Sequence, residues 1–192
     1  MSSKVITISR QFGTGGHTIA KKVAEKLGIP CYDYEVVEGI VEQSGLAEKY
    51  VKDRGDYIRG GWLSRVYAAG YKDQDIIWQL QQKVVTELAE KGPCVIVGRC
   101  ADEILRGKID CLRVFIHASM AFRADRIVRV YGHREKSPEQ RLKEKDKARA
   151  AYYQYYTDRK WGDAPNYHIT LDSGELGLDK CVDLIVDLYQ QK

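Results

Sequence analysis

The chain has 192 residues, of which 44% are hydrophobic and 30% are charged. It is therefore too apolar for an intrinsically disordered protein and long enough to bury a core without disulfides. The formal net charge of +4 suits a protein that handles phosphates, but it predicts no nucleic-acid partner.

The sequence carries no signal for a structural metal site, a membrane span or export. Its five cysteines include no CxxC pair, which argues against a disulfide framework and against a zinc site. No window approaches the ~18 consecutive apolar residues of a spanning helix, and the N-terminus lacks the apolar core of a signal peptide. We therefore expect a cytoplasmic protein without a membrane partner, folded as one domain over residues 1–192.

The first predicted unit is a strand, a glycine-rich loop and a helix. Val5–Ile8 is short and β-branched, which predicts a strand, and the loop at residues 9–18 follows at once. This loop is called the glycine loop below. A helix is predicted over Thr18–Leu27, because apolar residues recur on one face, and Gly28 and Pro30 mark its end.

Further along the chain, predicted strands alternate with predicted helices. Apolar or β-rich runs predict strands at residues 94–97, 112–116 and 167–171. Helical periodicity predicts helices at residues 74–91, 119–131, 137–158 and 175–190. This alternation indicates an α/β fold with a mostly parallel sheet.

Two stretches fall outside this alternation. Residues 35–73 are polar, punctuated by glycine and predicted to be helical. Residues 130–165, just before the last predicted strand, carry a dense basic set: Arg134, Lys136, Arg141, Lys143, Lys145, Lys147, Arg149, Arg159 and Lys160. A charge run is commonly a solvated helix face. Its position here also suits a lid that closes over a phosphate.

The glycine loop has the features of an anion site. Glycines let the backbone curl so that several N–H groups point into one concavity, and the positive end of the following helix adds to that field. The expected nucleotide-binding residues are Gly13, Thr14, Gly15, Gly16, His17 and Thr18. The alternatives are a tight turn without a ligand and, for the histidine, a capping or surface role.

The loop departs from the Walker A pattern GxxxxGK[ST] in two places. Arg10 stands at the first glycine, and Gly16 stands at the lysine that normally reaches the β- and γ-phosphates. Thr18 stands where loops of the form GKGT place a threonine, which makes it the expected contact for Mg²⁺. A rival interpretation is the dinucleotide fingerprint GxGxxG, because Gly13 and Gly15 fit it and Asp33 follows near where a ribose-binding carboxylate is expected.

Tyrosines and tryptophans near the basic stretch invite a base-stacking interpretation. Helical spacing puts Tyr152, Tyr155 and Tyr156 near one face, so we expect them to pack against the core instead. Trp62 and Trp78 lie in or near the stretch at residues 35–73, and one of them is a candidate to stack on an acceptor.

Several segments together resemble the cytidylate kinase-like family, an outlying branch of the nucleoside monophosphate kinases. They are ISRQFGTGGHTIAKKVAEKLG, PCYDYE, VIVGRCADEIL, FIHASMAFRADRI and DKARAAYYQYYTDRKWGDAPNYHITLDS. The resemblance implies a P-loop nucleotide kinase-like, three-layer α/β fold with a mostly parallel five-stranded sheet. It also implies a small monophosphate-binding insert at about residues 35–73 and a basic lid at about residues 130–165.

The resemblance also implies acceptor-binding residues. Arg99 follows a glycine as in the family's GRD motif, whose aspartate is replaced here by Cys100. Arg123 and Arg126 match an arginine-bearing helix that follows an Ala-Ser pair, and Asp33 loosely matches the aspartate of an LDxGxxYR segment. The rest of that segment, including its arginine, is not recognisable in this chain.

The catalytic residues implied are Arg99, Arg149 and Arg10. Residues 145–149 are similar to the RDxxR element of the family's lid, which places Arg149 there. Arg10 and Arg99 are the candidates to replace the missing lysine. An arginine brought by a lid contributes ~10³–10⁵ in rate in related chemistry, so a lid cation is a further way to offset its loss.

The expected reaction is ATP-dependent phosphoryl transfer to a nucleoside monophosphate, with CMP or dCMP as the first candidates. The cofactors are then ATP and Mg²⁺, and the partner is a small nucleotide; no oligomeric state follows from the sequence. The alternatives are a kinase of another small acceptor, a nucleotide-binding module without catalysis, which the missing lysine favours, and a dinucleotide oxidoreductase.

Overall fold

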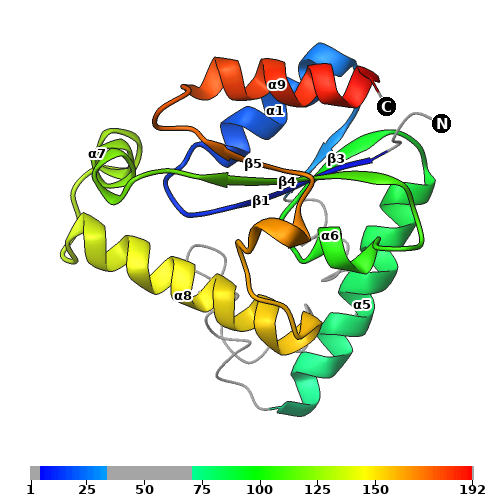
Figure 1. Ribbon diagram of the computed structural model, residues 1–192. Helices are drawn as coiled ribbons and strands as arrows, with labels where there is room; N and C mark the ends of the chain where they lie inside the picture. Colours follow the sequence, from blue (N-terminus) through cyan, green and yellow to red (C-terminus); the bar gives the residue numbers. More distant parts are fainter. Residues whose placement is uncertain (1–4, 34–70, 192) are drawn as a thin grey trace.

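A parallel sheet of five strands lies at the centre of the computed structural model, which describes residues 5–33 and 71–191 (Figure 1). The strands are β1 (Val5–Arg10), β2 (Cys31–Tyr32), β3 (Cys94–Val97), β4 (Cys111–His117) and β5 (Ile169–Asp172). The expected five-stranded parallel sheet is confirmed. Strand β2 has only two residues, too few for a periodicity, and was not among the strands predicted from the residues.

Helices cover both faces of this sheet. They are α1 (Gly16–Leu27), α5 (Tyr71–Glu90), α6 (Ala101–Ile104), α7 (Met120–Tyr131), α8 (Pro138–Thr157) and α9 (Leu178–Gln191), with a 3-10 turn η1 (Ala164–Asn166). Helices α1 and α9 lie on one face, and α5 and α6 lie on the other (Figure 1). The expected three layers are therefore present.

Strand alternation divides the core between the two faces. In β1, Ile6 and Ile8 pack under α1 and α9, whereas Val5 packs with α5 and α6. Strands covered on both faces are apolar almost throughout, as the sequence of β3 predicted. Cys94 and Cys111 are buried, as expected for small hydrophobic residues.

The order of the strands separates this fold from the dinucleotide-binding one. The sheet order is β2-β3-β1-β4-β5, so β1 pairs with β3 and β4. In the dinucleotide-binding order 3-2-1-4-5-6, the first strand pairs instead with the second. The oxidoreductase interpretation is therefore wrong at the level of the fold.

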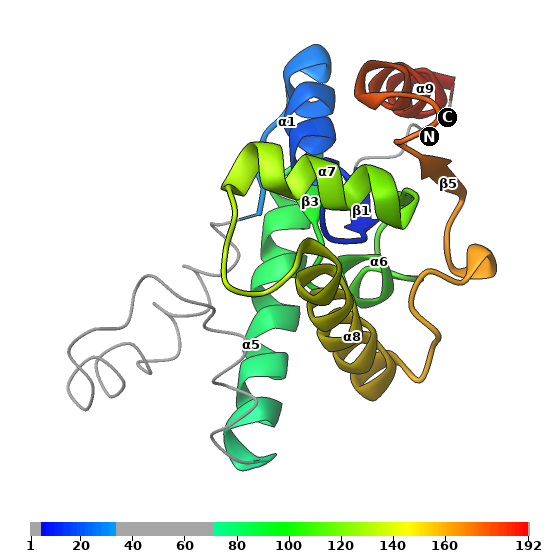
Figure 2. The ribbon, with the colours of Figure 1, turned by 90° about the vertical axis from the view of Figure 1, so that its left-hand side faces the viewer.

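The carboxyl ends of the strands meet at one edge, where α7 and α8 lie (Figure 2). Both helices begin at a serine whose hydroxyl accepts a hydrogen bond from the first turn: Ser119 from Phe122 N and Ser137 from Gln140 N, each at 3.2 Å. Ligands of open α/β sheets bind at this edge.

Some of the sequence predictions concern residues that lie outside the described ranges. The monophosphate-binding insert at about residues 35–73 falls almost wholly there, and so does Trp62. Within residues 5–33 and 71–191, none of the helices combines the length and the apolar character needed to cross a bilayer.

Candidate functional site

The glycine loop turns from β1 into α1 at the carboxyl edge of the sheet. Gly13 and Gly15 have φ values of 86° and 82°, in the left-handed region that favours glycine. Gly15 is the N-cap of α1, with no side-chain cap and no acidic residue in the first turn. N–H groups at the start of a helix have no intrahelical partners, so this end of α1 suits an anion.

The glycines also allow two helices to pack directly on the loop. A Cβ atom added at Gly13 would lie 2.9 Å from Ile127 Cγ2 on α7, and one at Gly15 would lie 2.9 Å from Leu178 Cδ2 on α9. Thr14 is fully buried, and its hydroxyl donates to the Gln11 carbonyl at 3.0 Å. The Thr14 side chain therefore braces the loop, and Ser173 holds the Thr14 carbonyl, to which its hydroxyl donates at 2.8 Å.

The side chain of Arg10 crosses the loop through space left by two glycines. A Cβ atom at Gly16 would lie 2.8 Å from Arg10 Cβ and Cγ, and one at Gly98, after β3, would overlap Arg10 Nη1. The guanidinium ends near Asp33, with 3.6 Å between Nη2 and Oδ1. Burial lowers the pKa of the Arg10 guanidinium.

Asp33 joins Arg10 to the start of α1. Its second oxygen, Oδ2, lies 2.8 Å from Nδ1 of His17. His17 is half exposed, so it lies at the surface of the loop, in contact with the carboxylate. Asp33, which loosely matches the aspartate of the LDxGxxYR segment, thus lies beside the glycine loop.

Arg99 and Arg149 lie close to Arg10. Arg149 Nη1 donates to the Arg10 carbonyl at 3.0 Å, and its guanidinium carbon lies 5.7 Å from the centre of the Phe12 ring. Burial, followed by the charge of Arg10, lowers the pKa of Arg149 to about 10. Burial also lowers the pKa of Arg99, and the charge of Arg10 adds to this effect.

Among the described residues these three arginines share one nearby carboxylate, because Asp33 acts electrostatically on each of them. The other carboxylate near Arg149, that of Asp146, pairs with Arg123. The described residues around Arg10, Arg99 and Arg149, at the open side of the glycine loop, therefore carry more positive than negative charge. Such an arrangement favours a polyanionic ligand.

Arg99 lies in a turn with unusual backbone angles. Gly98, Arg99 and Cys100 have φ values of 72°, 58° and 54°, all in the left-handed region. Non-glycine residues persist there only when neighbouring groups hold them, and such strain is typical of functional sites. The buried Gln81 on α5 supplies one constraint, because its Nε2 donates to the Arg99 carbonyl at 2.7 Å.

Arg123 is placed against the back of the loop and not at its mouth. It is buried, and its guanidinium donates to the carbonyls of Ala118 and Phe12, each at 3.1 Å. It also pairs with Asp146 on α8 at 2.5 Å, and Asp146 Oδ1 accepts a hydrogen bond from Phe12 N at 2.7 Å. We therefore correct its expected acceptor-binding role to that of holding the loop.

Arg126 lies over the end of the loop that leads into α1. Its Nη2 donates to Thr18 Oγ1 at 3.4 Å, and its guanidinium would lie 3.2 Å from a Cβ atom at Gly15. This position faces the start of α1, where the donor nucleotide is expected. A cation on the Thr18 hydroxyl also makes that oxygen a poor ligand for Mg²⁺.

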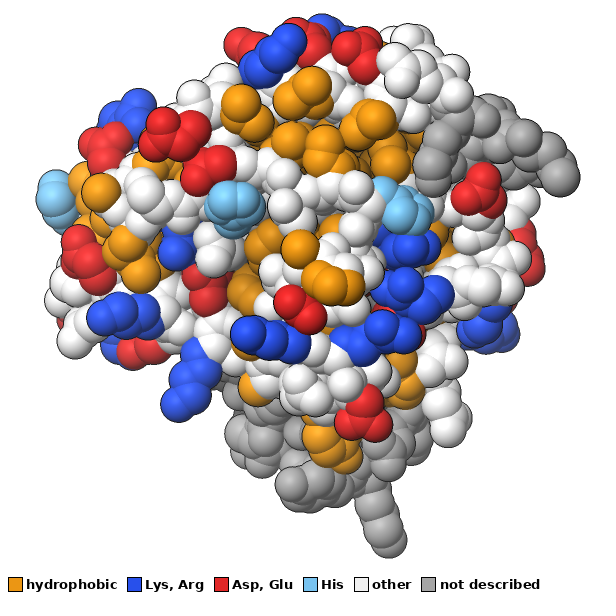
Figure 3. Space-filling view, in the orientation of Figure 1, with side chains coloured by type: hydrophobic (Ala, Val, Ile, Leu, Met, Phe, Trp, Pro, Cys, Tyr) orange, Lys and Arg blue, Asp and Glu red, His pale blue; other side chains and the backbone are white. Residues whose placement is uncertain are grey.

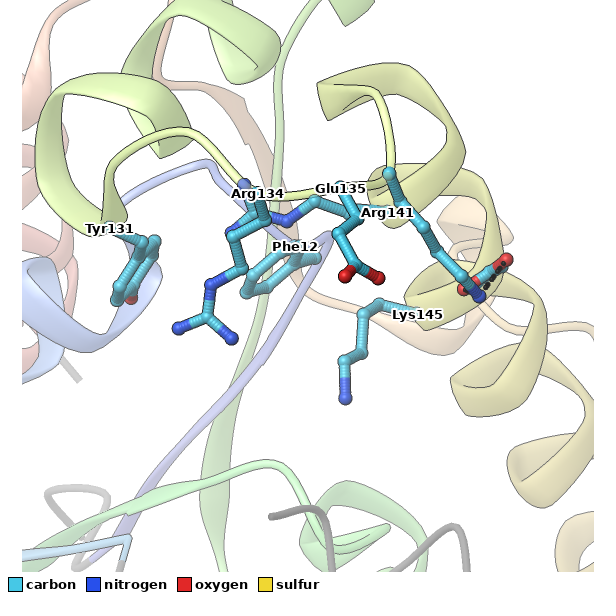
Figure 4. A pocket seen from close by; sticks show the side chains of 8 residues that line it. Phe12, Tyr131, Arg134, Glu135, Arg141 and Lys145 are labelled. Atoms are coloured by element: carbon cyan, nitrogen blue, oxygen red, sulfur yellow. Dashed lines mark hydrogen bonds and ion pairs between the residues drawn. The ribbon is translucent and has the colours of Figure 1, made fainter. Parts of the chain in front are cut away.

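A pocket of about 730 Å³ opens between the glycine loop and the turn from α7 to α8 (Figure 4). It is lined by Phe12, Tyr131, Arg134, Glu135, Lys136, Arg141, Glu144 and Lys145. Figure 4 shows the charged ends of Arg134 and Lys145 directed to the same side, into open space beside Phe12.

The cations of this pocket differ in their contacts. Lys136 pairs with Glu144 at 2.7 Å, and Arg141 donates to the Gly132 carbonyl at 3.3 Å. Arg134 and Lys145 form no ion pair within residues 5–33 and 71–191. The sequence grouped them with other basic residues of the stretch, and nothing in that stretch distinguishes them.

Other basic residues of residues 130–165 lie away from the loop. Arg159, just beyond the end of α8, pairs with Glu103 at 3.2 Å. Lys143 and Lys147 are exposed, and Figure 3 shows blue side chains spread along the region of α8, with red ones among them. The solvated-face interpretation therefore holds for part of the stretch.

The tyrosine prediction is wrong in its detail. Tyr153 packs into the core and donates to Asp102 Oδ2 at 2.7 Å, whereas Tyr155 is 54% exposed. Tyr156 stacks on Trp78, with ring centres 4.4 Å apart. A spacing of three and four selects a helix face but does not identify which face meets the core.

The comparison with known families agrees with this geometry. The profile of the cytidylate kinase-like family matches residues 5–175. The chain belongs to this family. A cytidylate kinase from Methanopyrus kandleri is 23% identical over 95% of this chain and 91% of its own.

Solved structures of other proteins share the fold of this cytidylate kinase-like chain. An uncharacterized protein from Eubacterium ventriosum has a TM-score of 0.75 and 31% identity, covering 98% of this chain and 99% of its own. A shikimate kinase from Acinetobacter baumannii, in complex with shikimate, has a TM-score of 0.58 and 16% identity, covering 98% and 94%. This chain has the P-loop kinase fold and belongs among the phosphotransferase-like enzymes.

Proposed function

We propose that this protein transfers the γ-phosphoryl group of ATP to a nucleoside monophosphate, with CMP or dCMP as the acceptor. An oxygen of the acceptor phosphate attacks the γ-phosphorus, and the bond from that phosphorus to the β–γ bridging oxygen breaks. The products are ADP and a nucleoside diphosphate. This reaction needs in-line positioning and neutralised charge rather than a protein nucleophile.

The observation that carries the proposal is the convergence of three arginines on the glycine loop. Arg10, Arg99 and Arg149 reach it from β1, from the end of β3 and from α8. Fixed cations at this place stabilise the charge that develops on the transferred phosphoryl group. The family match and the cytidylate kinase relative support the choice of acceptor.

Each part of the site has a role in this proposal. The backbone from Gly13 to Thr18 binds the donor phosphates, and Arg126 faces the donor nucleotide. Arg99 faces the acceptor phosphate, and Arg149 reaches the loop from α8. Arg134 and Lys145, which Figure 4 shows pointing into the pocket, add positive charge beside the loop.

Mg²⁺ is the metal expected for this chemistry. No group of three or more histidine, cysteine, aspartate or glutamate side chains that could hold a metal ion occurs in the part of the chain that the structure describes. Mg²⁺ is commonly held by one or two carboxylates together with substrate phosphates. Asp33 and the Thr18 hydroxyl are the groups beside the loop that would hold it, and each would exchange its present contact with a basic side chain for the ion. When bound, the ion neutralises charge on the β- and γ-phosphates.

A coupled assay of ADP release tests the proposal. Mg·ATP is offered with CMP, dCMP, UMP, AMP, GMP or shikimate to the wild type and to Arg99→Ala, Arg149→Ala and Arg129→Ala. We expect release that depends on CMP or dCMP, a loss of about 10³-fold in kcat for the first two variants and little change for Arg129→Ala. The exposed Arg129 pairs only with Asp125 among the described residues.

Other results would change the assignment. Turnover with shikimate, or with another monophosphate, would identify a kinase of a different acceptor on the same fold. ATP binding by calorimetry without turnover on any acceptor would point to a nucleotide-binding module without catalysis. Full activity in Arg99→Ala and Arg149→Ala would contradict the roles given to these arginines.

A further inference from the structure

The side chain of Arg10 occupies the space in which a Walker lysine would begin. A lysine at position 16 needs a Cβ atom, and that atom would lie 2.8 Å from both Cβ and Cγ of Arg10. Real Cβ contacts are essentially never shorter than 3.0 Å, so one of the two side chains must move. The absence of a side chain at Gly16 therefore makes room for the side chain of Arg10. The missing lysine at position 16 and the arginine at position 10 are two parts of the same structural change.

A second glycine completes the path of this side chain. Gly98 follows β3, and any side chain there would overlap the Arg10 guanidinium. The two glycines lie on separate segments, one at the start of α1 and one after the neighbouring strand. Both leave space for the same side chain, which carries the Arg10 guanidinium from the start of the loop to its mouth.

The end of this path lies beside other groups that handle phosphates. The guanidinium is 3.6 Å from Asp33, which in turn contacts His17 in the first turn of α1. It also lies within electrostatic range of Arg99 and Arg149. Arg10 thus places a permanent charge at the carboxyl edge of the sheet, between the donor loop and the turn that carries Arg99.

We propose that Arg10 is the catalytic cation that replaces the Walker lysine, reaching the β- and γ-phosphates of the donor from the opposite end of the loop. The inference deepens the proposed kinase function and rests on it for the catalytic step. Its binding consequence stands separately, because a cation on the terminal phosphates distinguishes a triphosphate from a monophosphate without any turnover.

Exchange of the two positions tests the proposal. The single variants are Arg10→Ala, Arg10→Gly, Arg10→Lys and Gly16→Lys. The double variant combines Arg10→Gly with Gly16→Lys, and Arg129→Ala is an exposed control. Calorimetry measures the binding of a non-hydrolysable ATP analogue and of AMP. Where the wild type turns over, kcat is measured alongside. Thermal melting shows which variants are folded.

We expect Arg10→Ala to weaken the ATP analogue by about 10- to 100-fold, as for loss of a charge-assisted hydrogen bond, and to leave AMP almost unchanged. Gly16→Lys alone loses affinity, because the new side chain collides with Arg10. The double variant regains the analogue affinity and, in an active enzyme, recovers kcat.

Two results would overturn the assignment. One is wild-type affinity for the analogue in a folded Arg10→Ala. The other is a folded double variant that binds the analogue no better than Arg10→Gly. If Arg10→Ala fails to fold, the assignment is tested instead by the affinities of the double variant and of Arg10→Lys for the analogue. A wild type that binds the analogue but shows no turnover refutes the kinase function and leaves the binding comparison decisive for Arg10.

Discussion

At the scale of single residues, the Arg123–Asp146 pair fixes the position of the glycine loop. Arg123 Nη1 and Asp146 Oδ2 are 2.5 Å apart, and their side chains are 6% and 18% exposed. Between them the two residues bond both the N–H and the carbonyl of Phe12. The backbone of one loop residue is thus held on both sides, from α7 by Arg123 and from α8 by Asp146.

Replacing Asp146 with asparagine therefore has a large expected effect. The substitution keeps an oxygen for Phe12 N but leaves the buried Arg123 without its counter-charge. Breaking one partner of a buried pair costs roughly 3–5 kcal/mol, and the partial exposure of Asp146 favours the lower end. Urea unfolding should show a loss of about 3 kcal/mol for Asp146→Asn. The exposed pair broken by Asp125→Asn should lose less than about 1 kcal/mol.

Equal losses of unfolding free energy in Asp146→Asn and Asp125→Asn would show that the buried pair stabilises the fold no more than the exposed pair. The role of this pair was not predictable from the sequence. Helical spacing placed Arg123 and Arg126 near each other, but the partner of Arg123 lies 23 positions away on another helix. Sequence spacing identifies neighbours within a helix and not across a tertiary contact.

At the scale of elements, α8 is attached to the body of the protein at several points. Its middle bonds the glycine loop through Asp146 and Arg149. Its second half bonds the short helix α6, because the Tyr153 hydroxyl donates to Asp102. Both Asp102 and Tyr153 are buried. The basic lid expected from the sequence is thus, over α8, a packed helix.

The Asp102–Tyr153 contact predicts a pH dependence of stability. Burial raises the pKa of the Asp102 carboxyl, although the hydrogen bond from Tyr153 opposes this effect. The folded state therefore binds this proton more tightly than the unfolded state, whose pKa is about 3.9. The resulting stability is present below the unfolded pKa and is lost as the pH rises through the higher folded pKa.

Asp102→Asn removes this titration while keeping an acceptor for Tyr153. Urea unfolding from about pH 4 to about pH 8 should show a steeper fall in stability for the wild type than for the variant. At neutral pH the variant should be at least as stable as the wild type. Asp125→Asn, at an exposed site, should follow the wild-type curve. Parallel curves for wild type and Asp102→Asn would refute the raised pKa.

At the scale of the whole molecule, the parts that were predictable are those with local signals. Continuous apolar runs located β3 and β4, and helical apolar patterns located the four longer helices that follow β2, all within a few residues. Strand β2 and helix α6, of two and four residues, are too short to show a period. The resemblance supplied what the patterns did not, namely the five-stranded sheet.

The candidate site was predictable to a similar extent. Arg10, Arg99 and Arg149 were proposed from motif positions, and the structure brings them together. Arg10 excludes a side chain at Gly16 because the two residues, at the two ends of the loop, lie close together in space. No single-sequence pattern records such a distance, so the sequence showed two separate departures where the structure shows one.

Binding of a nucleotide should stabilise the whole molecule. A ligand at about 100 times its dissociation constant adds about 2.7 kcal/mol if it binds only the folded state. For a chain of this size that corresponds to a rise of roughly 5–10 °C in Tm. Thermal melting with Mg·ATP should show this rise, and adenosine, which lacks phosphates, should produce little. Equal shifts with both would locate the binding energy outside the glycine loop.

The interlocked side-chain positions at Arg10 and Gly16 have an evolutionary consequence. A lineage with a lysine loop reaches this arrangement by two substitutions, and either one alone yields a chain with colliding cations or with none. Both single intermediates are expected to be impaired, so reversal is as difficult as the original change. Among descendants of such a lineage, residues 10 and 16 should therefore vary together or not at all, which makes their joint state a marker of common ancestry.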